Sequence, residues 1–268
     1  MDAKAYRVAA LMTAARYENT YCRNAIESAL RDAQLRLTIS LGVFYGQCMQ
    51  SLMENAIAEG CDIILTIDGD SIFNSGHVNR LLAVLCNGDK IDALASMQAR
   101  RSMPYPLFTT GADKVQSVSV QSDVPFRVAT AHFGLTAIKV APLCQVGKPW
   151  FFAQASDLGT WGKDTSKIDD DVWFWRQWEK FGKTLYVDPG CRIGHMEEMV
   201  SYYDDHLQLK HIYPSDWHDE QRRIQEENQN ATQATASMAG QADGLCLAGS
   251  ATGSLQAADQ TRDCGGVL

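Results

Sequence analysis

The sequence has no long apolar run, no excess of basic residues and no closely paired cysteines, and each absence excludes a class of protein. No run approaches the roughly 20 apolar residues that a membrane-spanning helix needs, and residues 1–7 lack the apolar core of a secretion signal. The formal net charge of −8 argues against a broad basic field for nucleic acid. The 8 cysteines contain no C-x-x-C pair, which indicates a reducing compartment. We therefore expect a cytoplasmic protein without an integral membrane segment.

The sequence does contain a regular alternation of predicted strands and helices over its first part. Its 268 residues are 46% hydrophobic, which is ample for a substantial core. Strand-like segments occur at 7–13, 34–41, 62–67 and 91–97, and helical periodicity occurs at 18–31, at 47–58 and after residue 75. This order predicts an α/β fold with a mostly parallel, Rossmann-like sheet flanked by helices.

The second part of the chain has a different pattern. Short alternating segments at 114–121 and 126–132 predict a small antiparallel portion, and a strand at 184–187 is followed by the turn residues 188–190. We expect one domain over residues 1–225, with its second half shaping the substrate site. From about residue 226 the composition changes to Gln, Ala, Ser, Thr and Gly, which predicts a disordered low-complexity tail over 226–268.

The most informative motif is the apolar run 61–67 that ends in Asp68-Gly69-Asp70. In an open α/β sheet, ligands bind beyond the carboxyl ends of the strands. Two carboxylates separated by one glycine can approach a cation and a phosphate there. Aspartate and glycine are also common turn residues, so a capping role is the alternative.

Two further groups are candidates for the same site. Residues 169–171 are three consecutive aspartates at the start of a predicted helix that continues through Phe181. The helix dipole favours acids in a first turn, but repulsion among three of them raises the proton affinity of at least one, which suits a general base. A lone histidine is usually structural; with Asp70 available, His195 becomes a candidate metal ligand.

The order of these features resembles the GT-A fold nucleotide-sugar glycosyltransferases, especially the family 2-like group. The resemblance spans residues 7–198. It rests on the segment 13–18, on Asp68-Gly69-Asp70, on the segment 132–135, on Asp170-Asp171 and on Gly194-His195. It implies a single GT-A domain with a nucleotide-binding half at about 5–100 and an acceptor-side half at about 101–225.

The resemblance also implies roles on the donor side. Thr13, Ala15 and Glu18 would line the pocket for the base and ribose, and Gly134 would lie beneath the donor sugar. Arg100, which follows a predicted strand, would assist the diphosphate charge, although surface arginines are common.

For the metal, the resemblance implies that Asp70 coordinates Mn²⁺ or Mg²⁺ on the diphosphate and that His195 completes the shell. Asp68 would contact the ribose or the water shell of the metal. The ion would stabilise the charge that develops on the leaving diphosphate.

On the acceptor side, the resemblance places Asp171 as the base of an inverting transfer, with Asp170 beside it. His132, Trp150 and Phe151 would contact the acceptor, although an aromatic cluster is more often part of a core. The acceptor itself stays open among a glycan, a small molecule, a protein and a hydroxymethylated base of phage DNA. The Gln-x-x-Arg-Trp signature has no clear counterpart, which argues against a processive polysaccharide synthase.

The main rival function is a phosphatase of the haloacid dehalogenase type. Asp68 would then be the nucleophile, Asp70 the acid and base, and Asp170 or Asp171 a ligand of Mg²⁺. Against this alternative, that nucleophile normally lies on the first strand, and His195 would have no role. A catalytically inactive binding protein is a further alternative.

Overall fold

The computed structural model describes residues 6–14, 18–99, 107–110, 123–161, 166–204 and 207–246. Its contacts divide the chain into two compact units, Met1–Glu197 and Glu198–Leu268. This division falls earlier than the predicted domain limit at residue 225. The predicted strand at 114–121 lies outside the described residues.

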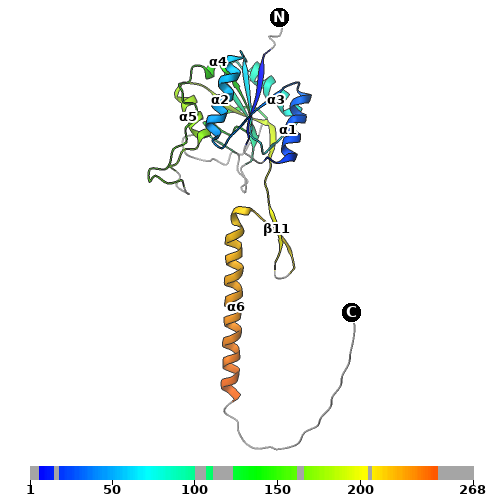
Figure 1. Ribbon diagram of the computed structural model, residues 1–268, viewed down its shortest axis with the longest axis vertical. Helices are drawn as coiled ribbons and strands as arrows, with labels where there is room; N and C mark the ends of the chain where they lie inside the picture. Colours follow the sequence, from blue (N-terminus) through cyan, green and yellow to red (C-terminus); the bar gives the residue numbers. More distant parts are fainter. Residues whose placement is uncertain are drawn as a thin grey trace, which may run out of the picture. The chain divides into compact units, whose positions relative to one another are not determined.

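The first part of unit 1 alternates strands and helices in the predicted order (Figure 1). Its elements are β1 (Val8–Ala14), α1 (Thr20–Asp32), β2 (Leu37–Leu41), α2 (Tyr45–Ala58), β3 (Ile63–Ile67), β4 (Ser71–Ile72), α3 (Ser75–Asn87) and β5 (Ala93–Gln98). Strand β3 is buried along its whole length, as its unbroken apolar sequence predicts.

The second part of unit 1 adds shorter strands around this framework. Its elements are β6 (Phe108–Thr109), β7 (Phe126–Arg127), β8 (Thr130–Ala131), β9 (Leu135–Lys139), α4 (Val140–Leu143), α5 (Asp170–Lys180) and β10 (Leu185–His195). The main sheet has the order β2-β1-β3-β9-β5-β10-β4, and β7 also pairs with β10. Strand β9 runs antiparallel between β3 and β5 in an otherwise mostly parallel sheet. Of the predicted antiparallel segment 126–132, β7 pairs antiparallel with β10 in this sheet and β8 pairs antiparallel with β6 outside it.

Helices cover both faces of the sheet (Figure 1). Helices α1 and α3 bury Ile26 and Leu81 against one face, and helices α2 and α5 bury Met49 and Trp175 against the other. The amphipathic spacing of each helix explains this arrangement, because its apolar side chains recur on one side. The mainly parallel sheet between helices confirms the predicted fold class.

The turn expected at 188–190 is instead a bulge within β10. The strand continues to His195, and its register with β5 shifts between Asp188 and Arg192. Asp188 is fully buried and accepts two hydrogen bonds from Arg80 of α3, at 2.7 and 2.9 Å. A Cβ atom at Gly190 would collide with the Arg80 guanidinium. The turn-forming sequence therefore bends the strand around a buried ion pair.

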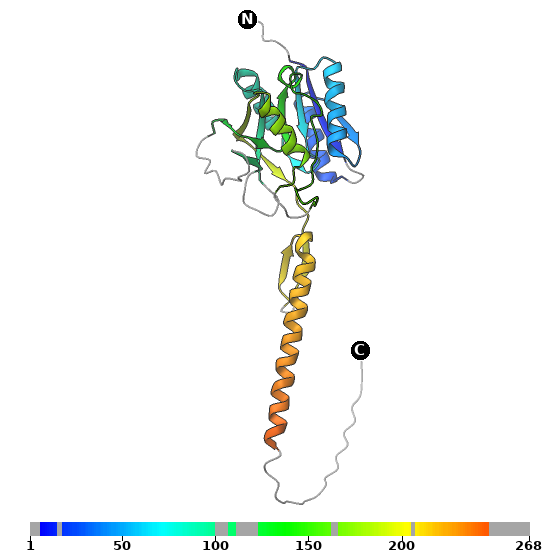
Figure 2. The same cartoon turned by 90° about the vertical axis from the view of Figure 1, so that its left-hand side faces the viewer.

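Unit 2 contains a hairpin and a long helix, which lie side by side in both ribbon views (Figures 1 and 2). Its elements are β11 (Val200–Tyr203), β12 (Leu209–Ile212), the 3₁₀ turn η1 (Pro214–Asp216) and α6 (Trp217–Cys246). The hydroxyl of Tyr202 donates to Glu220 at 2.7 Å, and its ring packs edge-on against Trp217.

Helix α6 differs from the prediction of a disordered tail from residue 226. The helix continues to Cys246, because alanine, glutamine and glutamate are good helix formers and Arg223 pairs with Glu227 one turn later. Residues 247–268 lie outside the described residues. In the part of the chain that the structure describes, no helix is both long and apolar enough to cross a membrane.

Candidate active site

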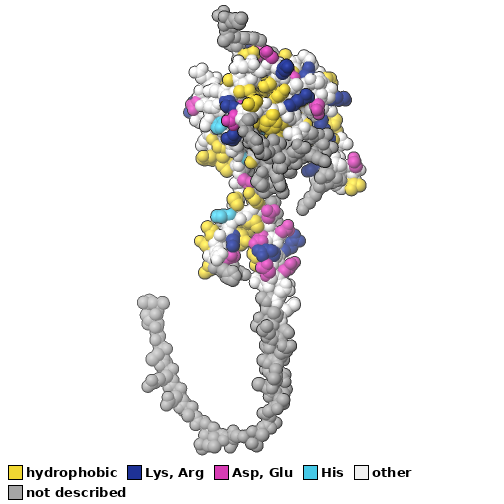
Figure 3. Space-filling view, turned by 180° about the vertical axis from the view of Figure 1, so that it is seen from behind, with side chains coloured by type: hydrophobic (Ala, Val, Ile, Leu, Met, Phe, Trp, Pro, Cys, Tyr) yellow, Lys and Arg dark blue, Asp and Glu magenta, His cyan; other side chains and the backbone are white. Residues whose placement is uncertain are grey.

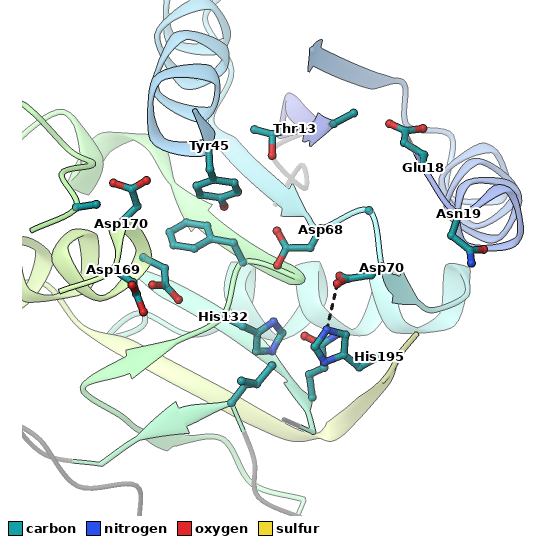
Figure 4. Close-up of a pocket in the computed structure, with 17 residues that line it drawn as sticks. Thr13, Glu18, Asn19, Tyr45, Asp68, Asp70, His132, Asp169, Asp170 and His195 are labelled. Carbon is teal, nitrogen blue, oxygen red and sulfur yellow. Dashed lines mark hydrogen bonds and ion pairs between the residues drawn. The ribbon is translucent and has the colours of Figure 1, made fainter. Parts of the chain in front are cut away.

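A cavity of about 650 Å³ lies at the carboxyl ends of the strands of unit 1 (Figure 4). It is lined by side chains that follow or end β1, β3, β5 and β10. Six carboxylates line it, and no lysine or arginine is among the described residues that do so. The carboxylates belong to Glu18, Asp68, Asp70, Asp169, Asp170 and Asp171.

The Asp68-Gly69-Asp70 motif begins where β3 ends, as its sequence predicts. The backbone N–H of Asp68 donates to the carbonyl of Gly134 at 3.3 Å, and that of Ser71 donates to the carbonyl of Asp68 at 3.1 Å. These bonds form a turn that leads directly into β4. Strand β4 pairs with the end of β10, so that Ser71 lies opposite His195.

This pairing brings Asp70 and His195 together from positions far apart in the sequence. Nε2 of His195 lies 3.2 Å from Oδ2 of Asp70, and Nδ1 lies 3.0 Å from the carbonyl oxygen of Ala99 (Figure 4). Because a carbonyl only accepts, Nδ1 carries a proton. The lone pair of Nε2 then faces a carboxylate oxygen of Asp70, and a bound cation can be shared by the two groups.

The Asp70 and His195 pair fits a small divalent ion. Oxygen and imidazole nitrogen are suitable ligands for Mn²⁺, and Mg²⁺ is commonly held by one or two carboxylates together with substrate phosphates. Adjacent octahedral ligands with bonds of about 2.1 Å lie about 3.0 Å apart, close to the observed separation. Among the described residues, no group of three or more His, Cys, Asp or Glu could enclose a metal. Asp68 is therefore not placed as a third direct ligand.

The aspartates at the start of α5 lie in different environments. Asp170 accepts a hydrogen bond from the N–H of Gly46, in the first turn of α2, where Phe44 provides no side-chain cap. Burial raises the pKa of Asp170, and Asp169 adds to this shift. Asp170 thus caps a helix, as the capping alternative for these acids allows.

Asp171 is the member with the properties of a base. Burial, together with the charges of Asp169 and Asp170, raises its pKa to about 6, although it accepts a hydrogen bond from the N–H of Val172 at 2.7 Å. A carboxylate with this pKa is ionised at neutral pH and is a stronger base than an ordinary aspartate.

His132 lies in the wall of the cavity as a neutral ring. The N–H of Gly134 donates to Nδ1 at 2.9 Å, so Nε2 carries the proton and donates to the carbonyl of Ser96 at 2.8 Å. Burial lowers the pKa of His132 to about 4. The ring therefore supports the backbone, and both of its nitrogens are engaged.

Gly134 is tightly enclosed next to the aspartate motif. A Cβ atom there would lie 2.6 Å from Oε1 of Gln98 and 2.7 Å from both Nδ1 of His132 and Oγ of Ser71. The Nε2 amide of Gln98 donates to Ser71 and to the carbonyl of Gly194, both at 3.2 Å. This buried polar network joins the ends of β4, β5, β9 and β10.

The structure does not bring every predicted residue to the cavity. Thr13 and Glu18 line it, whereas Trp150 and Phe151 are buried in the core between α2 and α5 and do not line it. The indole N–H of Trp150 donates to the carbonyl of Val146, which is a structural contact. The prediction that Trp150 and Phe151 contact the acceptor is therefore corrected: both side chains are part of the core.

Two of the predicted donor residues, Ala15 and Arg100, lie outside the described residues.

Sequence reasoning missed Tyr45, which stands over the middle of the cavity (Figure 4). Its ring packs edge-on against Phe133 and Phe151, and its hydroxyl is buried without a hydrogen-bond partner among the described residues. Burial and the charges of Asp68 and the α5 aspartates raise the pKa of Tyr45 well above its usual value. Its place just after β2 is the signal that could have identified it, because loops at the carboxyl ends of strands carry sites.

Comparison with known proteins supports the fold assignment. No family model and no curated protein matches the sequence. Among solved structures, A197 from STIV aligns with a TM-score of 0.50 and 11% identity over 76% of this chain and 92% of its own. GalNAc-T7, solved with UDP, GalNAc and Mn²⁺, aligns with a TM-score of 0.52 and 12% identity over 72% of this chain but 44% of its own. The chain therefore has a GT-A-like fold.

Proposed function

We propose that this protein is a metal-dependent glycosyltransferase that moves a sugar from a nucleoside-diphosphate sugar to an acceptor hydroxyl. The observation that carries the proposal is the pair of Asp70 and His195 in a cavity lined by six carboxylates. A diphosphate is repelled by such a cavity unless a cation accompanies it. When bound, Mn²⁺ or Mg²⁺ would neutralise the charge on the diphosphate.

The GT-A-like fold supports the choice of donor. In GalNAc-T7 the ligands are UDP, GalNAc and Mn²⁺. We therefore infer that a uridine diphosphate sugar and Mn²⁺ are the first combination to test. Thr13 and Glu18, at the β1 side of the cavity, would contact the nucleotide portion.

The chain's own residues would perform the transfer by displacement at the sugar. The acceptor oxygen forms a bond to the anomeric carbon while the bond from that carbon to the diphosphate oxygen breaks. The proton of the acceptor hydroxyl passes to the carboxylate of Asp171, and the electron pair leaves with the nucleoside diphosphate. Attack from the side opposite the leaving group inverts the anomeric configuration.

The phosphatase alternative fits this geometry less well. It would make Asp68 the nucleophile, Asp70 the acid and base, and Asp170 or Asp171 a ligand of Mg²⁺, and it gives no role to His195, which lies 3.2 Å from Asp70. Asp170 is already engaged with the N–H of Gly46. A site completed by substrate phosphates needs only Asp70 and His195.

Calorimetric titration of UDP, with Mn²⁺ and with EDTA, tests the proposal. We expect saturable binding with Mn²⁺ that is lost with EDTA, in Asp70→Ala and in His195→Ala. Asp89→Ala, which removes an exposed carboxylate that does not line the cavity, is the control and should bind UDP as the wild type does. Equal binding with and without metal in the wild type would contradict the proposal.

A further inference from the structure

We propose that Phe152 and Trp173 form a platform that binds a neutral saccharide acceptor, an inference that rests on the proposed function. The two rings come from the segment before α5 and from α5 itself. Their centroids lie 5.2 Å apart at an interplanar angle of 60°. Phe152 is 49% exposed, whereas its neighbour Phe151 is 7% exposed. Trp173 is half-buried, so the ring surface left for a ligand is mainly that of Phe152.

Phe152 and Trp173 do not line the cavity themselves, but each is close in sequence to residues that do. Ala153, the residue after Phe152, lines the cavity, and Gln154 pairs with Ile168 in an antiparallel bridge. This bridge places the segment that contains Phe152 beside the chain that enters α5 at Asp169. Figure 4 shows Asp169 and Asp170 on the opposite side of the cavity from Glu18 and Asn19.

The platform is held in place by its surroundings. The indole N–H of Trp173 donates to the carbonyl of Pro149 at 3.4 Å. The Gln154 to Ile168 bridge has two backbone hydrogen bonds, at 2.8 and 2.9 Å, and holds the segment that follows Phe152. A preorganised aromatic surface loses little entropy when a ligand stacks on it.

The charge of the adjoining wall selects the kind of acceptor. Residues 169–171 are acidic, and Lys167, which precedes them, lies 3.9 Å from the carboxylate of Asp169. Proteins that bind nucleic acid gain much of their affinity from basic contacts to phosphates, and among the described residues 166–171 the one basic side chain, Lys167, is paired with Asp169. A neutral sugar ring presents an apolar C–H face to an aromatic surface and hydroxyl groups to the aspartates. The observations therefore favour a saccharide over hydroxymethylated DNA.

Separate measurement of donor hydrolysis and sugar transfer tests this inference. The donor is whichever sugar nucleotide the wild type hydrolyses, and the acceptor probes are maltotriose, cellobiose and p-nitrophenyl glucosides, with hydroxymethylcytosine duplex DNA as the rival. We expect Phe152→Ala and Trp173→Ala each to lower transfer to the saccharide roughly tenfold while hydrolysis in the absence of acceptor is unchanged. Phe152→Tyr, which keeps the stacking surface, should restore most of the transfer.

Phe181→Ala is the matched control, because Phe181 is a 42% exposed aromatic at the other end of α5. It should leave both rates unchanged. The inference is overturned if the wild type transfers sugar to the DNA or to none of the saccharides, or if Phe152→Ala loses no more transfer than Phe181→Ala. If the wild type hydrolyses none of the sugar nucleotides, that result would instead contradict the proposed function.

Discussion

At the scale of the residue, Asp171 is the side chain on which the chemistry depends. Asp171→Asn removes the base but keeps an oxygen that can accept from the N–H of Val172. We expect the transfer rate to fall by about 10²–10⁴-fold, the usual contribution of a general base. In the wild type, the rate should rise with pH through a midpoint near 6, because the base must be ionised and burial raises its pKa to about 6.

We expect Asp171→Asn, which lowers the transfer rate, to raise the stability of the folded protein. A carboxyl group whose pKa is higher in the folded than in the unfolded protein binds more protons when folded between the model value of 3.8 and about 6. Stability therefore falls as pH rises through this window, and the ionised form is unfavourable above it. Asp171→Asn should raise the free energy of unfolding at pH 7 by on the order of 1 kcal/mol. Urea denaturation at pH 7 measures this free energy. A lower value for folded Asp171→Asn than for the wild type would contradict a raised pKa at Asp171.

Gly134 is predicted to be intolerant of any side chain. In Gly134→Ala the added methyl group would overlap Gln98, His132 and Ser71. Overpacking of this kind typically costs about 1–3 kcal/mol, and the shift would disturb the turn that carries Asp68. Thermal denaturation and metal-dependent UDP binding measure the two effects. Gly159→Ala offers a contrast, since no atom lies within 4 Å of its Cβ position; its positive φ of 73° would make any loss a backbone effect.

Residues that line the cavity could be predicted where an element boundary marked them. Asp68 and Asp70 follow an apolar strand, and Asp171 lies in the first turn of a helix. The burial of Trp150 depends instead on packing between α2 and α5, which no local pattern encodes. Tyr45 was missed for another reason: its place after β2 marks it as a candidate, but an aromatic near a helix start is typical of a core.

At the scale of the element, the bulge in β10 determines where His195 lies. Arg80 of α3 pairs with the fully buried Asp188 inside this bulge. Arg80→Ala leaves that carboxylate without its ion-pair partner and should cost roughly 3 kcal/mol. Arg80→Lys should recover only part of this loss, because an ammonium group cannot form the bidentate contact.

Arg192→Ala is the control for Arg80→Ala in urea denaturation. Its partner Asp123 and Arg192 itself are both about two-thirds exposed, at 67% and 68% of their side chains. Loss of an exposed pair costs less than about 1 kcal/mol. Equal effects of Arg80→Ala and Arg192→Ala would show that the bulge does not depend on the buried pair.

The alternation of strands and helices was predictable because each element carries its own hydrophobic period. Strand β9 (Leu135–Lys139) was not predicted, because its antiparallel place between β3 and β5 is set by tertiary contacts. The residues 188–190 were predicted as a turn because Asp, Pro and Gly favour turns, and the buried pair with Arg80 overrides this preference.

At the scale of the whole molecule, the fold class was predictable from the order of elements, whereas the division of the chain was not. The contacts of unit 2, including that of Tyr202 with Glu220, separate it from unit 1 after Glu197. Low-complexity composition suggested disorder, but the good helix formers in this segment extend α6 to Cys246. Figure 3 shows acidic and basic side chains interspersed among the described residues of the face it draws.

Truncation tests this division. A chain that ends at Glu197 contains every described cavity-lining residue, and we expect it to unfold cooperatively and to bind UDP with Mn²⁺ as the full chain does. A chain that ends at residue 225 should behave in the same way. If the chain that ends at residue 225 folds and the chain that ends at Glu197 does not, the domain limit predicted from the sequence, residue 225, is correct.

The most direct test of the central claim is the release of nucleoside diphosphate from UDP, GDP, dTDP and ADP sugars with Mn²⁺ or Mg²⁺. The account predicts metal-dependent release from at least one sugar nucleotide and its loss in Asp70→Ala, because Asp70 is placed to hold the ion with His195. Cleavage of a phosphomonoester that needs Mg²⁺ and is lost in Asp68→Asn, with no release from any sugar nucleotide, would contradict it.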